Sequence, residues 1–177
     1  IPWFDDASYI VVGRDGRDAF MSFLNHMRAQ RPEVMADLVN SAIEEGIDVG
    51  PPPPVHDVHE FFEYWLDDGF LFDFIASYWG RRSQDNVCFV HFNELKADLD
   101  AQMRRVAAFL GIDVASSIGA DRWDAVVQSC TFEGMKARSD DIAPFEIMFE
   151  GGSNAFLFKG TNDRWREVLT DQELAAY

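Results

Sequence analysis

Two arginines and a serine stand where an apolar run of the sequence gives way to an expected helix. The run Tyr-Ile-Val-Val-Gly (residues 9–13) is followed by Arg14, and Ser22 lies eight residues after that arginine. A guanidinium fork and a hydroxyl that converge on one point can hold a phosphate. The N-terminus of the helix adds free N–H groups and the positive end of its dipole. The local alternative is an ion pair, because aspartates flank both Arg14 and Arg17.

A second candidate anion-binding segment lies near the C-terminus. Residues 159–163 read Lys-Gly-Thr-Asn-Asp, a glycine-containing turn between Phe158 and Trp165. The backbone N–H groups of such a turn, together with Lys159 and Gly160, can wrap an anion. Taken alone, the segment is more simply interpreted as a loop with a solvated lysine.

The four histidines do not form a pattern typical of a metal site or of nucleophilic catalysis. His56 and His59 have an HxxH spacing, but no further histidine or cysteine is spaced to complete a zinc shell. His26 and His91 stand beside apolar residues, which favours a structural role. Neither a Ser-His-Asp arrangement nor a Walker A loop occurs. We therefore expect no metal and identify no catalytic residue in this chain.

Charge and composition narrow the class of protein. The 177 residues carry a formal net charge of −16, and 47% of them are hydrophobic. Such an acidic globular chain does not suit nucleic acid or an anionic membrane as a broad partner. Cys88 and Cys130 do not have the CxxC spacing of a metal or redox site. We therefore expect two reduced, buried thiols in a cytoplasmic protein. No apolar run has the length of a membrane span, so we expect a cytoplasmic protein with one domain over residues 1–177.

The elements that must position these residues follow from the hydrophobic pattern. Residues 9–13 and 86–92 are predicted strands, because both runs are almost continuously apolar. Strands separated by helices imply parallel pairing through crossover connections. Two aromatic-rich helices after the prolines at 51–54 are expected to be buried, and so is Leu110 at the end of another helix. The remaining helices are expected from Asp15, over 33–43 with Gly46 ending it, over 98–110, near 121–130 and after Thr170, which would form a capping box with Glu173.

Three segments resemble the soluble sulfotransferase family. "YIVVGRDGRDAFMSFLNH" (residues 9–26) is similar to the family's 3′-phosphate-binding strand and helix, in which a serine follows the closing arginine by eight residues. "VCFVHFNELKADLDAQMRRVAAFLGI" (87–112) resembles its "YEDLK" strand and helix, and "FLFKGTNDRW" (156–165) resembles its "RKGxxGDW" signature. The resemblance implies an α/β fold of the P-loop type, with a central parallel sheet flanked by helices and here incomplete at the N-terminus.

The same resemblance implies a cofactor and the residues that bind it. Family members transfer a sulfuryl group from 3′-phosphoadenosine-5′-phosphosulfate (PAPS) to a hydroxyl or amine, and they release 3′-phosphoadenosine-5′-phosphate (PAP). Arg14 and Ser22 would bind the 3′-phosphate. Lys159 and Gly160 would close over the same phosphate. Phe132, in "CTFEGMK", would stack on the adenine, since an aromatic face can hold any base.

The sequence also departs from the family pattern. Phe158 stands where many members have an arginine, Phe92 where a tyrosine is usual, Asp163 where a glycine is usual, and Gly16 where a proline or alanine is frequent. Neither the phosphosulfate loop of "PKSGTTW" type nor the "KTHLP" segment with the catalytic histidine occurs. We therefore expect a C-terminal portion of a sulfotransferase, which supplies the 3′-phosphate and adenine half-site and part of the acceptor pocket.

Other functions stay open at this point. A P-loop-type nucleotide-dependent phosphotransferase shares the fold and the phosphate cradle, and a non-catalytic nucleotide-binding or scaffold protein would keep the fold without the chemistry. The acceptor is expected to be a small, hydrophobic molecule, with the aromatic residues between 33 and 80 as pocket and lid. A homodimer is left open, because residues 166–173 resemble the family's dimerisation segment only loosely.

Overall fold

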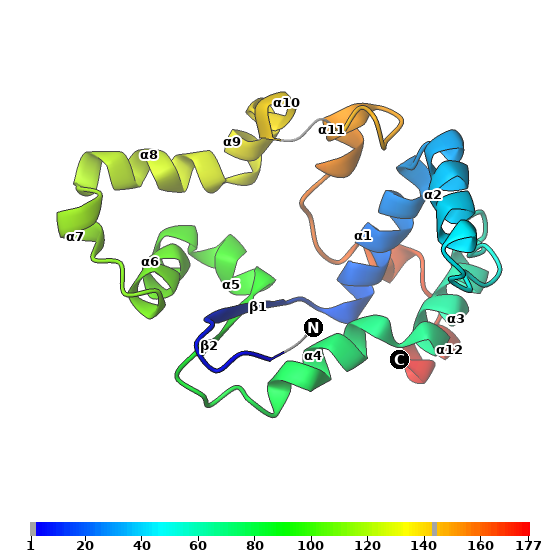
Figure 1. Cartoon of the computed structure of the whole chain (residues 1–177), viewed down its shortest axis with the longest axis horizontal. Helices are drawn as coiled ribbons and strands as arrows, with labels where there is room; N and C mark the ends of the chain where they lie inside the picture. The colour runs from blue at the N-terminus through cyan, green and yellow to red at the C-terminus, as the bar shows by residue number, and fades with distance from the viewer. Residues whose placement is uncertain (1–2, 143–144) are drawn as a thin grey trace. The chain divides into compact units, whose positions relative to one another are not determined.

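The computed structural model describes residues 3–142 and 145–177, and Figure 1 shows their helices and strands. The described chain divides into two compact units, each assembled from two stretches of sequence. The first unit joins the stretch that ends at Asp15 with Gly69–Gly134, and the second joins Gly16–Asp68 with Met135–Tyr177. One short helix, α9 (Phe132–Ala137), contains the boundary.

The first unit contains a two-stranded parallel sheet. β1 (Tyr9–Gly13) and β2 (Val87–His91) pair residue for residue along their full length, and they lie side by side in Figure 1. Val11, Tyr78 and Val87 form the buried cluster on this sheet. The apolar runs predicted both strands and their parallel pairing, and these predictions are confirmed.

Helices follow and flank the sheet of the first unit. The helix expected over 98–110 is α6, but a short helix, α5, precedes it and was not predicted from the sequence. Asp98 separates the two, because its backbone has a φ of −152° and its side chain accepts the N–H of Ala101 at 3.0 Å. The helices of this unit are α4 (Phe70–Trp79), α5 (Phe92–Ala97), α6 (Leu99–Phe109), α7 (Val114–Ser117) and α8 (Ala120–Cys130).

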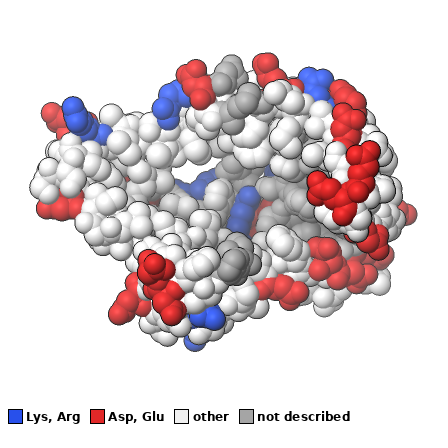
Figure 2. Space-filling view, viewed as in Figure 1, with Lys and Arg blue, Asp and Glu red and all other residues white. Residues whose placement is uncertain are grey.

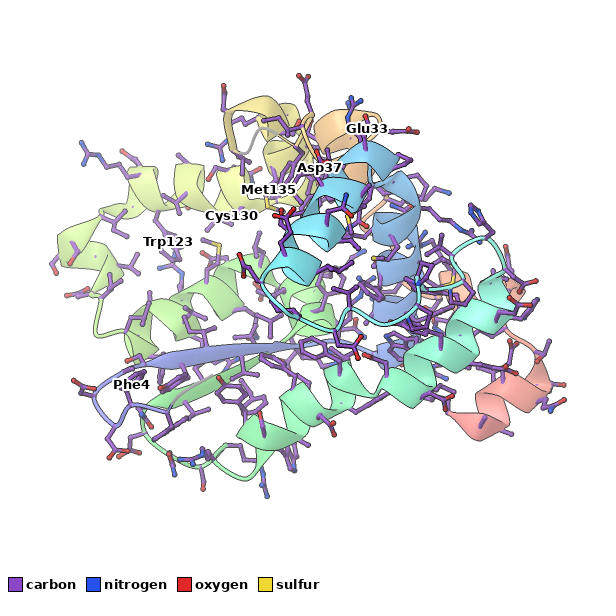
Figure 3. The ribbon with its side chains drawn as sticks, turned by 45° about the vertical axis from the view of Figure 1, so that its right-hand side comes forward. Phe4, Glu33, Asp37, Trp123, Cys130 and Met135 are labelled. Atoms are coloured by element: carbon purple, nitrogen blue, oxygen red, sulfur yellow. The ribbon has the colours of Figure 1, made fainter. Side chains whose placement is uncertain are left out.

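A carboxylate joins α6 to α8. Trp123, labelled in Figure 3, donates its indole N–H to Asp100. Arg104, one turn along α6, reaches the same carboxylate at 2.9 Å. These hydrogen bonds, the one from Arg104 first, hold the pKa of Asp100 below its ordinary value. Trp123 is only 3% exposed, so this indole is buried where α8 meets α6.

Three expectations about burial are wrong. On α4, Phe70 is 71% exposed and Trp79 is 54% exposed, because the helix packs only one face against the sheet. A helix that is apolar all round does not reveal which face is covered. Leu110 lies just beyond the last turn of α6 and is 45% exposed. Cys130 is the last residue of α8 and is also exposed, whereas Cys88 is buried as expected.

The second unit has an aromatic core. Phe20, Phe61 and Phe62 have no exposed surface, and the Phe20 ring lies 5.9 Å from Phe61, 4.9 Å from Phe62 and 5.7 Å from Trp65. Phe61, Phe62 and Trp65 recur at helical spacing on the first of the two predicted aromatic helices, and Phe20 comes from the helix predicted from Asp15. The elements of this unit are α1 (Gly16–Ala29), α2 (Pro32–Glu44), α3 (Val58–Asp68), α10 (Ser139–Ile142), α11 (Gly152–Phe156), the 3₁₀ helix η1 (Arg164–Glu167) and α12 (Asp171–Ala176).

The helix α2 contributes nothing to this core. It has no buried residue, and its acidic side chains form part of the acidic rim on the right of Figure 2. Glu33 and Asp37 stand one turn apart on it, as Figure 3 shows. Gly46, at a φ of +77°, follows its end as predicted. No helix in residues 3–142 or 145–177 has both the length and the apolar character of a membrane span.

Candidate functional site

Arg14 lies at the carboxyl end of β1, where ligands bind in open parallel sheets. It directly follows Gly13, which pairs with His91 at the end of β2. The guanidinium carbon of Arg14 is 4.4 Å from the ring centroid of Phe92, the first residue of α5. Arg14 is half-buried. A cation over an aromatic face is attracted by the negative face of the ring. Phe92, at the family's tyrosine position, thus supports Arg14.

Ser22 lies on α1 in the second unit. It is half-buried and lines a cavity of about 330 Å³ together with Phe23, Asn25, His26 and Phe156. Burial lowers the pKa of His26 below its ordinary value, and the His26 ring lies 5.8 Å from that of Phe156. The cavity therefore combines a hydroxyl and an amide with two aromatic rings, so it can receive a ligand that is partly apolar.

The loop with Lys159 and Gly160 is joined to α1 by a buried carboxylate. Asp18, only 4% exposed, accepts the backbone N–H of Asp163 at 2.7 Å. Asp163 has a φ of +66°, in the left-handed region that glycine enters most easily. This conformation explains why a glycine suits the position, and aspartate is among the residues that tolerate it.

The cations of this loop gather around an aromatic ring. Lys159 is exposed, and its Nζ lies 5.0 Å from the ring centroid of Phe158. The guanidinium of Arg164 lies 5.5 Å from the same ring. Gly160 has a φ of +59°, so the turn favours glycine there. Two positive charges thus flank the ring that replaces the family's arginine.

Arg17 lies against two aromatic rings that are far from it in the sequence. Its guanidinium carbon is 3.9 Å from the ring centroid of Trp165 and 5.2 Å from that of Tyr177. Trp165 is buried, at 4% exposure. The tryptophan belongs to the recognised "FLFKGTNDRW" segment and could have been paired with Arg17, but nothing in the sequence indicates Tyr177.

Phe132 is the first residue of α9 and is half-buried. Thr131 before it donates its hydroxyl to the carbonyl of Gln128 at 2.8 Å and accepts the N–H of Gly134 at 3.0 Å. A side chain at Gly134 would collide with that carbonyl, so this turn requires glycine. The turn fixes the direction in which the chain leaves α8 and thereby places Phe132.

The predicted site residues fall into two groups. Arg14 and Phe132 belong to the first unit, whereas Ser22, Lys159 and Gly160 belong to the second. Within the second unit, the hydrogen bond between Asp163 and Asp18 ties the loop of Lys159 to the helix of Ser22. Ser22 and the loop of Lys159 and Gly160 are therefore connected within the second unit.

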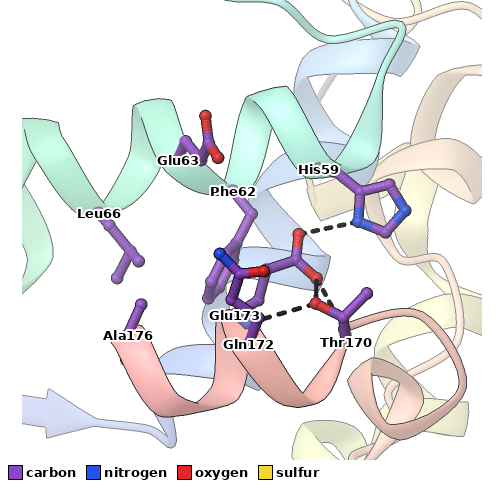
Figure 4. A pocket seen from close by; sticks show the side chains of 8 residues that line it. All are labelled: His59, Phe62, Glu63, Leu66, Thr170, Gln172, Glu173 and Ala176. Carbon is purple, nitrogen blue, oxygen red and sulfur yellow. Dashed lines mark hydrogen bonds and ion pairs between the residues drawn. The ribbon is translucent and has the colours of Figure 1, made fainter.

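One histidine of the HxxH pair, His59, contacts a carboxylate. His59 Nδ1 lies 2.8 Å from Glu173 Oε1 in a cavity of about 300 Å³ between α3 and α12 (Figure 4). This hydrogen bond raises the pKa of His59 above its ordinary value. Burial acts to raise the pKa of Glu173, but hydrogen bonds from Thr170 and His59 outweigh it and leave that pKa lowered. Among the described residues, no three His, Cys, Asp or Glu side chains converge as metal ligands.

The sheet and its helices place the chain in the α/β class, and comparison with known proteins defines it further. The chain matches the sulfotransferase-domain family over residues 2–177. It belongs to the sulfotransferase family, and its resemblance to that family in motif order and spacing is confirmed.

Curated relatives and solved structures agree with this assignment. The chain is 27% identical over 199 residues to a glycolipid sulfotransferase of Mycobacterium bovis, covering 98% of this chain and 59% of that protein. It is 24% identical over 174 residues to human sulfotransferase 2B1, covering 97% and 42%. Mouse sulfotransferase SULT7A1 complexed with PAP superposes with a TM-score of 0.67 at 19% identity, covering 96% of this chain and 55% of that one. Retinol dehydratase in complex with retinol and PAP gives 0.68 at 19% identity, covering 97% and 46%.

These likenesses confirm the P-loop-type α/β fold predicted from the sequence. The chain spans little more than half the length of the first curated relative, at 59%.

Proposed function

We propose that this chain forms the 3′-phosphate and adenine half-site of a PAPS-dependent sulfotransferase. The observation that carries the proposal is Arg14 at the carboxyl end of a parallel strand, eight residues before Ser22, in a chain of the sulfotransferase family. Two structurally similar proteins are described as complexes with PAP, which supports PAPS as co-substrate and PAP as product. The complete protein transfers the sulfuryl group to a hydroxyl or amine without a metal.

Each site residue has a role that its chemistry can supply. Arg14 offers a guanidinium fork to two phosphate oxygens, and Ser22 donates a hydroxyl hydrogen to a third. Lys159 and the N–H of Gly160 close over the same phosphate. Phe132 stacks on the adenine, and stacking contributes about 1–3 kcal/mol per base. The catalytic histidine and the phosphosulfate loop are not among these residues, so the chain supplies binding and the remainder of the fold supplies the transfer.

The acceptor is a small, hydrophobic molecule in this proposal. The second unit exposes three aliphatic side chains on α2, namely Leu38, Val39 and Ile43. The relative from Mycobacterium bovis is a glycolipid sulfotransferase, which fits an acceptor with an apolar part. We place α2 and the aromatic segment after it at the acceptor as lid and pocket wall. The chain acts in the cytoplasm as one sulfotransferase-like domain over residues 1–177, and a homodimer is left to experiment.

Calorimetric titration of the full chain with PAP and with ATP tests the proposal. PAP should bind at least tenfold more tightly than ATP, because only PAP carries a 3′-phosphate. Arg14→Ala should weaken PAP binding about tenfold to a hundredfold, the loss expected for hydrogen bonds to a charged group. The melting temperature should change little, since Arg14 follows the last residue of β1 and is only half-buried.

Arg122→Ala is the matched control, because Arg122 is an exposed arginine on α8. It should leave PAP binding unchanged. Equal affinity for ATP and PAP would favour the phosphotransferase alternative. An Arg14→Ala variant that melts early yet binds PAP normally would assign Arg14 a structural role instead.

A further inference from the structure

The N-terminus of α1 meets the tyrosine that follows α12. The backbone N–H of Gly16, the first residue of α1, points to the hydroxyl of Tyr177 at an N···O distance of 3.2 Å. The two residues are 161 positions apart in the sequence. The first N–H groups of a helix have no partner within the helix, so a partner from elsewhere fixes where the helix begins. Tyr177 provides that partner.

The approach of Tyr177 to this backbone leaves room for glycine, and a larger residue at this position would displace the tyrosine. A Cβ on Gly16 would lie 2.7 Å from the Tyr177 hydroxyl oxygen and 3.2 Å from Cη2 of Trp65. Gly16 does not have a positive φ, so the glycine provides space and not conformational freedom. The proline or alanine frequent at this position in the family would not fit beside Tyr177 and Trp65.

The ring of Tyr177 also contacts the next residue of α1. Arg17 lies with its guanidinium between Trp165, at 3.9 Å, and Tyr177, at 5.2 Å from the ring centroids. Each cation–π contact contributes about 0.5–1 kcal/mol at an exposed site and more when desolvated. The hydroxyl of Tyr177 thus fixes the backbone of the first turn, while its ring fixes a side chain of the same turn.

Tyr177 is itself held by contacts of α12. This helix has six residues, too few for a stable helix on its own. Thr170 and Glu173 form a reciprocal capping box at its start. Glu173 also bonds His59 on α3, as Figure 4 shows. These contacts tie α12 to the aromatic core of the unit and give Tyr177 a defined place.

We infer that Tyr177 is a positioning residue for the cofactor half-site. It fixes the first turn of α1 and thereby Ser22, which lies further along the same helix, relative to the loop of Lys159 and Gly160. The inference rests on the proposed PAP site for its effect on affinity. The contact itself does not depend on that proposal.

Tyr177→Phe in the full chain tests the role of the hydroxyl. It keeps the ring and removes the hydroxyl that accepts the Gly16 N–H. PAP affinity should fall about threefold to tenfold, which corresponds to one hydrogen bond. The melting temperature should stay within about 3 °C of the wild type. Tyr64→Phe is the matched control, because Tyr64 lies on α3 of the same unit and is 37% exposed; it should change neither quantity.

A double-mutant cycle with Gly16→Ala sharpens the test. Gly16→Ala alone should weaken PAP binding more than Tyr177→Phe does, because the new methyl group displaces the tyrosine. In the Tyr177→Phe background, the added methyl should cost less, since the atom at 2.7 Å is gone. A coupling of at least threefold in affinity is expected, whereas strictly additive effects would overturn the inference.

Hydrogen exchange at residues 16–18 separates this inference from the proposed function. Tyr177→Phe should speed amide exchange in this first turn and leave the exchange of α3 unchanged. If the wild type does not bind PAP but Tyr177→Phe speeds amide exchange at residues 16–18, the proposed function fails and the positioning contact stands. If the wild type binds PAP and Tyr177→Phe alters neither affinity nor exchange, the inference fails alone.

Discussion

The consecutive helices α1 and α2 have nearly the same length, 14 and 13 residues, but opposite surroundings. The helix α1 buries four residues, Gly16, Asp18, Phe20 and Leu24, whereas α2 buries none. The partners of α1 come from distant parts of the sequence, such as Asp163 and Tyr177. The helix α2 has local signals, a proline in its first turn and a glycine after its end, and its distant hydrogen bonds come from its N-cap residue, Arg31, which donates to the carbonyls of Met148 and Glu146 at 2.9 Å each.

This difference shows that α1 is held by more tertiary contacts than α2. The helix that carries the proposed phosphate ligand is fixed by an aromatic core on one side and by hydrogen bonds at its N-terminus. The helix that we place at the acceptor has no buried side chain, and hydrogen bonds from its N-cap residue, Arg31, to the carbonyls of Met148 and Glu146 attach it at one end. A binding site for an invariant group benefits from rigid support, whereas a lid over an acceptor can vary in sequence without affecting the core.

Truncating the core of α1 should have the largest effect. Phe20→Ala removes a side chain with no exposed surface and should lower the free energy of unfolding by about 3–5 kcal/mol. Chemical denaturation measures this loss. Phe23→Ala on the same helix is the control, because Phe23 is 42% exposed and should cost less than half as much. Equal losses at the two positions would contradict the burial of α1 described above.

Removing the buried carboxylate of α1 should have the next largest effect. Asp18→Ala leaves the N–H of Asp163 without its acceptor and should cost about 1–3 kcal/mol. Asp18→Asn keeps an acceptor oxygen and should cost less. Hydrogen exchange of Asp163 should accelerate in the alanine variant only. A protected Asp163 amide in Asp18→Ala would show that this bond does not hold the loop.

The contact between α3 and α12 should give a smaller, pH-dependent effect. The raised pKa of His59 adds stability below the unfolded value, and this stability is lost as pH rises through the folded pKa. The lowered pKa of Glu173 adds stability that is lost as pH falls through its own folded pKa. His59→Gln should therefore lower the melting temperature by about 1–3 °C near pH 5.5 and by less near pH 8.5. His56→Gln, at an exposed neighbour, should leave both melting curves unchanged; a loss that is equal at the two pH values would exclude the ion pair as its cause.

A substitution on α2 should have the smallest effect on stability. Ile43 is 56% exposed, so Ile43→Ser should change the free energy of unfolding by no more than about 0.5 kcal/mol. If α2 closes over an apolar acceptor, the same substitution in the complete protein should raise the KM for that acceptor and leave PAP affinity unchanged. A large loss of stability would mean that α2 is anchored in a way unlike the one described here.

The same comparison explains what could be predicted from the sequence. Strong local signals predicted the strand at Tyr9–Gly13, the end of α2 at Gly46 and the capping box of Thr170 with Glu173. These features depend on neighbouring residues, so a pattern in the sequence contains most of the information. The sequence also predicted that Arg14 follows the first strand and that Ser22 lies on the next helix.

Features that depend on distant residues could not be predicted in this way. The pairing of Gly16 with Tyr177 and of Asp18 with Asp163 arises only when the chain has folded. The exposure of Phe70 depends on which face of α4 the sheet covers, and a helix that is apolar all round does not indicate this face. The helix α5 was missed because a single residue, Asp98, ends it and caps the start of α6.

The different exposure of the two cysteines allows one of them to be labelled selectively. Cys130 is exposed and Cys88 is buried, so a maleimide dye should react at one position of the unaltered protein. That position stands two residues before Phe132, at the end of α8. The dye's emission would then register a nucleotide arriving at the proposed adenine position, and a plate reader could rank candidate nucleotides without any engineered label.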